Sequence, residues 1–228
     1  MSRNIIEVRD LVKKYNGRKA ILDDISFSVG KAEFIAVYGK SGCGKTTLLN
    51  ILGGLDRPTS GSVLIDDVDI VGLSEDELAK LRLKKIGFVF QDFNLLMDLT
   101  VRENVALPLR FSKTKDDGRV DDLLARFDIK HIAKETANKI SGGEAQRTAI
   151  ARAMMNQPTI ILADEPTGNL DLENTGNVMV ILEGLRKDFG TTLILATHDQ
   201  SLTSQATRKL LLDEGKLSQS GGGSVAQN

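Results

Sequence analysis

One glycine-rich segment limits what this chain can fold into more than any other feature. Residues 39–46 read GKSGCGKT and match the pattern G-x-x-x-x-G-K-[ST]. An apolar run at 34–38 precedes them, and a helix-forming run at 47–52 follows. A strand, a glycine loop and a helix in this order let backbone N–H groups surround a phosphate chain at the helix N-terminus. In such a loop Lys45 reaches the β- and γ-phosphates, and Thr46 places its hydroxyl on Mg²⁺.

The composition is that of an ordinary globular protein. The 228 residues are 41% hydrophobic and 27% charged, and they can form one large core or two modest lobes. A net charge of −1 provides no basic surplus, so we expect no nucleic-acid partner. No apolar run approaches the length of about 20 residues that spans a bilayer, and the N-terminus lacks a signal-peptide core. With Cys43 as the single cysteine, we expect a cytoplasmic protein without an internal disulfide.

Strand and helix patterns alternate along most of the chain. Apolar, β-branched runs at 34–38, 86–90, 159–163 and 192–197 are typical of buried strands. Their alternation with helical patterns predicts an α/β fold with a mainly parallel core sheet. Shorter strand-like segments separated by turn residues predict a small antiparallel sheet beside it; they lie at 5–11, 25–29 and 62–65.

Two helix starts carry a capping box, in which a hydroxyl and a carboxylate three residues later satisfy each other's backbone donors. The pairs are Ser74 with Glu77 and Thr100 with Glu103, before predicted helices at 75–83 and 101–107.

We expect a single domain at 1–217, with a helical lobe inserted at about 92–141. The strand signal fades in that stretch, and residues 120–127 space their apolar side chains for a helix. Residues 218–228 are rich in Gly, Ser and Gln, which predicts a disordered tail because such a segment buries too little apolar surface.

Two carboxylates follow the apolar run at 160–163. Asp164 and Glu165 would lie at a strand C-terminus, which is where an α/β sheet places its ligands. Asp164 is suited to hold Mg²⁺ through water, and Glu165 is suited to act as the general base on an attacking water. A solvated acidic turn is the alternative interpretation, but unpaired carboxylates after a buried strand are costly unless a cation or hydrogen bonds meet them.

A second candidate anion site lies at Ser141, Gly142 and Gly143. A serine hydroxyl and two flexible glycines come before a predicted helix at 145–155, whose N-terminus attracts anions. One nucleotide cannot easily occupy this site and the loop at 39–46 from the same side. The sequence therefore favours a site shared between two copies.

Three further residues carry weaker signals. His198 follows the last predicted core strand and can hydrogen-bond a terminal phosphate. Gln91 follows the run at 86–90 and offers a carbonyl to metal or water, while Tyr15 offers an aromatic face for adenine. The other histidine, His131, lies in the expected helical lobe with no carboxylate or cysteine set around it, and we interpret it as a surface residue.

With these residues in order, the chain resembles the ATP-binding subunit of ABC transporters from Ile5 to about Leu217. Seven separated elements match in order: an adenine-stacking Tyr15, the Walker A segment 39–46, the Q-loop Gln91, the signature 141–144, the Walker B strand 160–164 with Glu165, the D-loop 169–171 and the switch His198.

The resemblance implies an ATPase that uses ATP and Mg²⁺ and acts with a transmembrane permease subunit, peripheral on the inner face of the membrane. It also implies a head-to-tail dimer, in which a second ATPase subunit completes each site. Each of the two ATP molecules lies between Walker A of one subunit and the signature of the other. The implied catalytic residues are Glu165, His198, Lys45 and Gln91, and the implied metal ligands are Thr46, Gln91 and Asp164. The implied nucleotide contacts are Tyr15, Gly39, Lys40, Ser41, Gly42, Cys43, Gly44, Lys45, Thr46, Thr47, Ser141, Gly142 and Gly143.

Within the family, residues 53–61 and 163–171 are similar to the branch that serves lipoprotein release, macrolide or peptide export, and cell division. The stretch 95–101 is similar to the cell-division member, and residues 54–58 are similar to the lipoprotein and export members, so both alternatives stay open. The signature departs from the usual pattern at Ile140, Glu144 and Ala145. The first two leave the phosphate contacts in place, and the third could weaken coupling to the permease.

Two rival functions are disfavoured. A soluble ABC-type ATPase on ribosomes or DNA needs two ATPase halves in one chain, a coiled-coil insertion or zinc modules, none of which this sequence contains. An inactive regulatory subunit conflicts with the presence of both Glu165 and His198. After Gln91 come Phe93, Leu95, Leu96 and Met97, more apolar residues than a small lobe needs for its core, so we expect some to be exposed at a protein interface.

Overall fold

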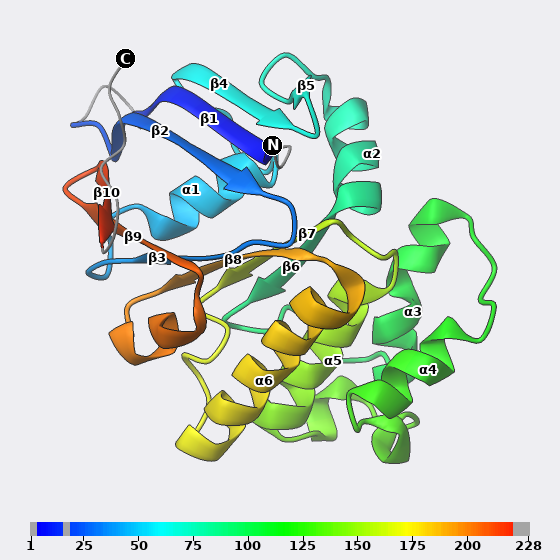
Figure 1. Cartoon of the computed structure of the whole chain (residues 1–228). Coiled ribbons are helices and arrows are strands. Elements are labelled where there is room, and N and C mark those ends of the chain that lie inside the picture. Colours follow the sequence, from blue (N-terminus) through cyan, green and yellow to red (C-terminus); the bar gives the residue numbers. More distant parts are fainter. Residues whose placement is uncertain (1–3, 16–18, 221–228) are drawn as a thin grey trace.

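Two β-sheets face each other across one helix in this protein. The computed structural model describes residues 4–15 and 19–220. Figure 1 shows α1 (Lys45–Leu52) lying between a small sheet and the main sheet. Leu48, Leu49, Ile51 and Leu52 of this helix are fully buried or nearly so, in a core that takes side chains from both sheets. A helix with apolar side chains on opposite faces is stable when both faces are covered, and the two sheets cover α1 in this way.

The main sheet has the strand order β10-β9-β3-β8-β7-β6. All neighbours pair in parallel except β10 and β9, which are antiparallel. The mainly parallel sheet predicted from sequence is therefore confirmed. Its strands are β3 (Phe34–Tyr38), β6 (Ile86–Phe90), β7 (Ile160–Asp164), β8 (Thr192–Thr197), β9 (Arg208–Asp213) and β10 (Lys216–Ser220).

The small sheet is antiparallel, as the sequence predicts, and has the order β2-β1-β4-β5. Alternate residues of β1, such as Ile6 and Val8, are buried against the core, which is typical of a sheet with one covered face. Its strands are β1 (Asn4–Lys13), β2 (Leu22–Gly30), β4 (Ser60–Ile65) and β5 (Val68–Asp69).

Helices cover the other face of the main sheet and extend to one side of it (Figure 1). Their buried residues form a second core with Phe34, Val89 and Ile161 of the sheet. These helices are α3 (Val101–Ser112), α4 (Arg119–Arg126), α5 (Gly142–Met154) and α6 (Leu172–Phe189), with 3₁₀ helices at Lys130–Ile132, Ala137–Lys139 and Gln200–Gln205. The remaining helix, α2 (Glu75–Lys85), lies beside the small sheet, and its Leu78 is buried in the core around α1.

Both predicted capping boxes are present, at Ser74 and at Thr100. The helices that they start run further than predicted, and α3 continues past Pro108 to Ser112. In the described ranges, no helix combines the length and the apolar character needed to cross a bilayer.

The predicted tail begins too early. Residues 218–220 belong to β10, where Ser218 pairs with Leu211 and Gln219 with Leu210. The prediction failed because backbone pairing with β9 orders this segment without any apolar pattern of its own. The rest of the predicted tail, 221–228, lies outside the described residues.

Candidate functional site

The glycine-rich loop joins the carboxyl end of β3 to the start of α1. Gly44 is the N-cap of α1 and has φ 110°, a left-handed conformation that side-chain-bearing residues rarely adopt. Its carbonyl accepts the first helical hydrogen bond, from Leu48 N at 2.9 Å. The predicted order of strand, glycine loop and helix is therefore present, and the first N–H groups of a helix, which have no partner within the helix, are the groups that bind an anion.

The Lys45 ammonium lies within the curve of this loop. Its Nζ donates to the carbonyl oxygens of Gly39 (3.0 Å) and Lys40 (3.2 Å), and it lies 3.4 Å from Glu165 Oε1. The side chain is only 5% exposed. Two carbonyl oxygens and one carboxylate fix the position of this buried ammonium. A fixed ammonium is suited to bind a phosphate group.

Asp164 ends β7 with a carboxyl oxygen that lacks a protein partner. Oδ1 is buried and makes no hydrogen bond within the described residues. Burial raises the pKa of Asp164, the charge of Glu165 adds to this, and Thr46 and Lys45 act in the opposite direction. A buried carboxylate oxygen without a donor is costly, and a hard divalent cation is the ligand that satisfies it. Asp164 and Thr46 thus fit a Mg²⁺ site.

Glu165 and His198 come together from the ends of adjacent strands. Glu165 Oε2 lies 2.8 Å from His198 Nδ1 and accepts from the His198 backbone N–H at 3.2 Å. Glu165 has φ 46°, and its N–H donates to Ala196 O in β8 at 2.9 Å. The strained backbone and this hydrogen bond aim the carboxylate between His198 and Lys45.

The serine of the second candidate site is part of a helix cap. Ser141 is the N-cap of α5: its Oγ accepts from Glu144 N at 3.4 Å, and Glu144 Oε2 accepts from Ser141 Oγ at 2.6 Å and from its backbone N–H at 2.8 Å. The hydroxyl of Ser141 holds the pKa of Glu144 below its ordinary value. The helix therefore begins at Gly142, so the predicted start at residue 145 is wrong by three residues.

The two glycines of this site lie in the first turn of α5 against residues 169–174. A Cβ on Gly143 would be 2.2 Å from Asn174 Oδ1, and one on Gly142 would be 3.6 Å from Leu170 Cδ2. His131 is mainly exposed, but its Nε2 lies 3.6 Å from Glu144 Oε1. The expectation that no carboxylate lies around His131 is wrong, because the fold places Glu144 of α5 beside it.

Comparisons with known proteins identify the family. A family model described as "ABC transporter" matches residues 22–168. The chain belongs to the ABC transporter family. Two relatives from Bacillus subtilis (strain 168) are the ABC transporter ATP-binding protein YxdL, 43% identical over 94% of this chain and 85% of its own, and the uncharacterized ABC transporter ATP-binding protein YvcR, 42% identical over 93% and 85%.

Solved structures agree with this assignment. A dimeric structure of the ATP-binding cassette MJ0796 in a post-hydrolysis state, bound to ADP and Pi, has a TM-score of 0.87 with 37% identity and covers 95% of this chain and 99% of its own. A second dimeric MJ0796 structure, of a bacterial ABC transporter cassette, has a TM-score of 0.86 with 39% identity and covers 93% and 96%. The protein is therefore an ABC ATPase that binds and hydrolyses ATP.

In this ABC ATPase, Gln91 is tied to the segment that follows β7. Gln91 Nε2 donates to Asn169 Oδ1 at 3.4 Å, and Asn169 Nδ2 donates to Gln91 O and Asp92 Oδ1, both at 3.1 Å. The sequence placed Gln91 at a strand end but did not predict this link to Asn169. The link gives the loop after β6 a direct contact with Asn169, which lies beside Gly142 of α5.

Two other contacts were also missed. Gln146 of α5 is fully buried and donates to Pro166 O at 2.5 Å, so it joins α5 to the loop after Glu165. Tyr15 lies at the end of β1, 40% exposed, with its hydroxyl on Asp56. Both contacts link residues far apart in sequence, and no local pattern predicts them.

Proposed function

We propose that this ABC ATPase closes as a head-to-tail dimer around two ATP molecules and drives a transmembrane permease of the lipoprotein-release or macrolide-export type. A cell-division-type ATPase that signals mechanically across the membrane is the alternative within the same branch. The observation that carries the proposal is the convergence of Lys45, Asp164, Glu165 and His198 at the carboxyl edge of the main sheet. It supports hydrolysis at a phosphate chain held by the loop 39–46.

Each residue has a role that follows from its contacts. Lys45 binds the terminal phosphates, Glu165 takes a proton from the attacking water, and His198 orients Glu165 and steadies the γ-phosphate. Thr46, Asp164 and Gln91 would hold Mg²⁺, which neutralises charge on the phosphate oxygens when bound. Glu165 already has Lys45 and His198 beside it, so its carboxylate is fixed before substrate arrives.

The dimer is supported by the position of the signature residues. Ser141, Gly142 and Gly143 form the N-terminal turn of α5, where backbone N–H groups favour an anion. Their immediate neighbours are Leu170 and Asn174, in the segment after Glu165. We infer that this turn closes the ATP site of a second copy, with Ser141 and Gly143 on the γ-phosphate.

A groove of about 700 Å³ supports a permease partner. Its walls are α2 and α3 and its floor is β6, where Phe88 and Phe90 stack with ring centroids 5.3 Å apart. Of the charged residues that line it, Asp76 and Lys80 of α2 are exposed. An apolar groove with a charged rim fits a short amphipathic helix of the permease. The lobe 92–141 supplies only one wall, so the expected docking region is enlarged by α2.

The loop beside this groove presents two apolar side chains. Leu96 is 48% exposed and Met97 is 50% exposed, whereas Leu95 is buried against Ala145 and Ala149. The fully buried Asn104 shapes the loop: its Oδ1 accepts from Leu96 N at 2.9 Å, and its Nδ2 donates to Leu96 O at 3.0 Å. The expected exposure of some of these residues is confirmed for Leu96 and Met97.

Replacing Leu96 or Met97 with glutamate is expected to abolish co-purification with the permease and the permease's stimulation of hydrolysis. A buried charge at an apolar contact costs several kcal/mol unless it is paired. The affinity for the permease should therefore fall at least about a hundredfold. Basal ATPase activity and Tm should stay near wild type, because both side chains point outward. Val68→Glu, at an equally exposed apolar residue of β5, is the matched control and should leave the complex intact. Normal permease binding by Leu96→Glu, or its unfolding, would place the docking surface elsewhere.

The neighbouring gene separates this branch from other transporters. A permease with four transmembrane helices and a large outer domain supports the proposal, and a six-helix permease contradicts it. ATP-driven release of a lipoprotein or a macrolide by the reconstituted complex would then separate transport from mechanical signalling.

A further inference from the structure

We infer that Asp56 is a positioning residue for nucleotide binding, which holds Tyr15 at a fixed distance from the phosphate loop and leaves one face of its ring to the base. The inference rests on the proposed function as an ATP-binding subunit and on the contact between Tyr15 and adenine that the sequence predicts. Asp56 lies 41 residues from Tyr15 in sequence, in the loop that follows α1. Its two carboxyl oxygens serve two different partners.

The first partner is the Tyr15 hydroxyl. It donates to Asp56 Oδ2, and Thr47 of the first turn of α1 lies beside it. Burial and the Asp56 carboxylate raise the pKa of Tyr15, so the phenol stays protonated and keeps donating. A ring fixed at its hydroxyl can pivot only slightly, which restricts the plane that a stacking base meets.

The second partner is the Lys13 ammonium. Its Nζ donates to Asp56 Oδ1 and to Arg57 O, both at 2.6 Å, and lies 4.4 Å from the centroid of the Tyr15 ring. Burial alone would raise the pKa of Asp56, but hydrogen bonds from Lys13 and Tyr15 hold it below its ordinary value. Lys13 therefore covers one face of the ring as a cation–π contact, and a base would stack on the opposite face.

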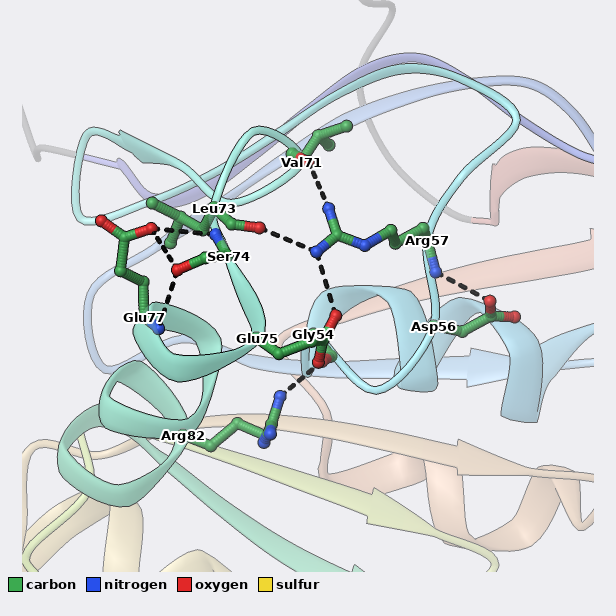
Figure 2. Close-up of polar contacts among 9 residues, drawn as sticks. All are labelled: Gly54, Asp56, Arg57, Val71, Leu73, Ser74, Glu75, Glu77 and Arg82. Atoms are coloured by element: carbon green, nitrogen blue, oxygen red, sulfur yellow. Dashed lines mark hydrogen bonds and ion pairs between the residues drawn. The ribbon is translucent and has the colours of Figure 1, made fainter.

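The loop that carries Asp56 is itself fixed on several sides. Figure 2 shows the Arg57 guanidinium reaching the carbonyl oxygens of Val71 and Leu73, each at 2.8 Å, and the Glu75 carboxylate at 3.0 Å. Arg82 of α2 donates to Gly54 O at 2.6 Å (Figure 2).

Backbone hydrogen bonds join the same loop to α1. The N–H groups of Leu55 and Asp56 donate to Asn50 O at 2.8 and 3.2 Å. Since α1 starts at Lys45, one short helix connects the phosphate contact to the carboxylate that holds Tyr15. The spacing between base and phosphates is thus set by α1 and Asp56 together.

Asp56→Asn tests this positioning role. An asparagine has one oxygen where two are needed, so its amide group faces either Lys13 or the Tyr15 hydroxyl. The Kd for ATP should rise about three- to tenfold, the range for the net contribution of one ordinary hydrogen bond, while the Kd for inorganic tripolyphosphate stays unchanged. Asp121→Asn, in the helical lobe, is the matched control and should change neither value. Equal weakening for both ligands would overturn the inference, because it would indicate general distortion.

Tyr15→Phe removes only the hydroxyl and guards against a misfolded Asp56 variant. It should weaken ATP binding to a similar extent. The Tyr15→Phe, Asp56→Asn double variant should have a Kd for ATP within about twofold of that of either single variant. Independent, multiplying losses would show that Asp56 does not act through Tyr15.

Tyr15→Ala separates the inference from the proposed function. Losing a stacking ring should weaken ATP about 5- to 100-fold relative to tripolyphosphate. If Tyr15→Ala leaves the ratio of ATP affinity to tripolyphosphate affinity unchanged, the base does not bind Tyr15, and the base contact fails together with the inference. If Tyr15→Ala lowers this affinity ratio but Tyr15→Phe and Asp56→Asn do not, the positioning role of Asp56 alone is wrong.

Discussion

Replacing Glu165 with glutamine should reduce steady-state ATP hydrolysis by about 10²-fold or more while leaving ATP binding intact. The glutamine keeps the size of the side chain but cannot accept a proton from water, and loss of a general base costs about 10²- to 10⁴-fold. Lys45 keeps its hydrogen bonds to the carbonyl oxygens of Gly39 and Lys40 in this variant, so its ammonium stays in the loop. Phosphate release at saturating ATP measures turnover, and a fluorescent ATP analogue measures binding.

Glu173→Gln provides the matched control. Glu173 lies exposed in the first turn of α6, and its substitution is the same chemical change at a residue that is given no role in hydrolysis. It should keep normal turnover. If Glu165→Gln also turned over ATP at a near-normal rate, Glu165 would not be the base, and the contact with His198 would need another explanation.

Replacing Gly143 with alanine should lower turnover at least about tenfold without changing ATP binding by the monomer. The new Cβ would lie 2.2 Å from Asn174 Oδ1. Asn174 has little freedom to move aside, because its Nδ2 donates to both carboxyl oxygens of Asp171 at 3.0 Å. The first turn of α5 must therefore shift, and a displacement near 1 Å at a reacting group can cost about 10²-fold.

Gly184→Ala, in the interior of α6, is the control for this substitution. No heavy atom outside its own helix lies within 4 Å of the added Cβ, so normal activity is expected. A Gly143→Ala protein with wild-type turnover would show that the signature turn is not part of the catalytic surface.

Local signals predicted the phosphate loop and the strands of the parallel sheet, because the loop and each strand lie within a short stretch of sequence. The run at 34–38, the glycines after it and Lys45 are consecutive, and their structure is set by neighbours along the chain. The capping boxes at Ser74 and Thr100 are equally local, since four residues satisfy each other's donors.

The same pattern at Ser141 was overlooked. Ser141 and Glu144 have the spacing of a capping box, but Gly142 and Gly143 lie between them, and glycine is a poor helix former. A glycine is needed at position 143 because Asn174 lies where a side chain would be. This reason belongs to the packing of α6 against α5, and the local sequence does not contain it.

Contacts between distant segments could not be predicted either. Asp56 meets Tyr15 and Lys13 only after β1, α1 and β4 have packed, and α2 becomes a wall of the groove at β6 only when it lies across from α3. Such pairs depend on the topology of the two sheets, which a single sequence specifies only through the whole core.

The mass of the Glu165→Gln protein in the presence of ATP and Mg²⁺ tests the shared site most directly. Blocked hydrolysis should trap ATP between the Lys45 loop of one copy and the Ser141 turn of the other. Light scattering after gel filtration, at micromolar protein and millimolar ATP, should give a dimer with ATP and a monomer without it. Adding Gly143→Ala to this protein should restore the monomer. A Glu165→Gln protein that stays monomeric with ATP would contradict the two-copy ATP site.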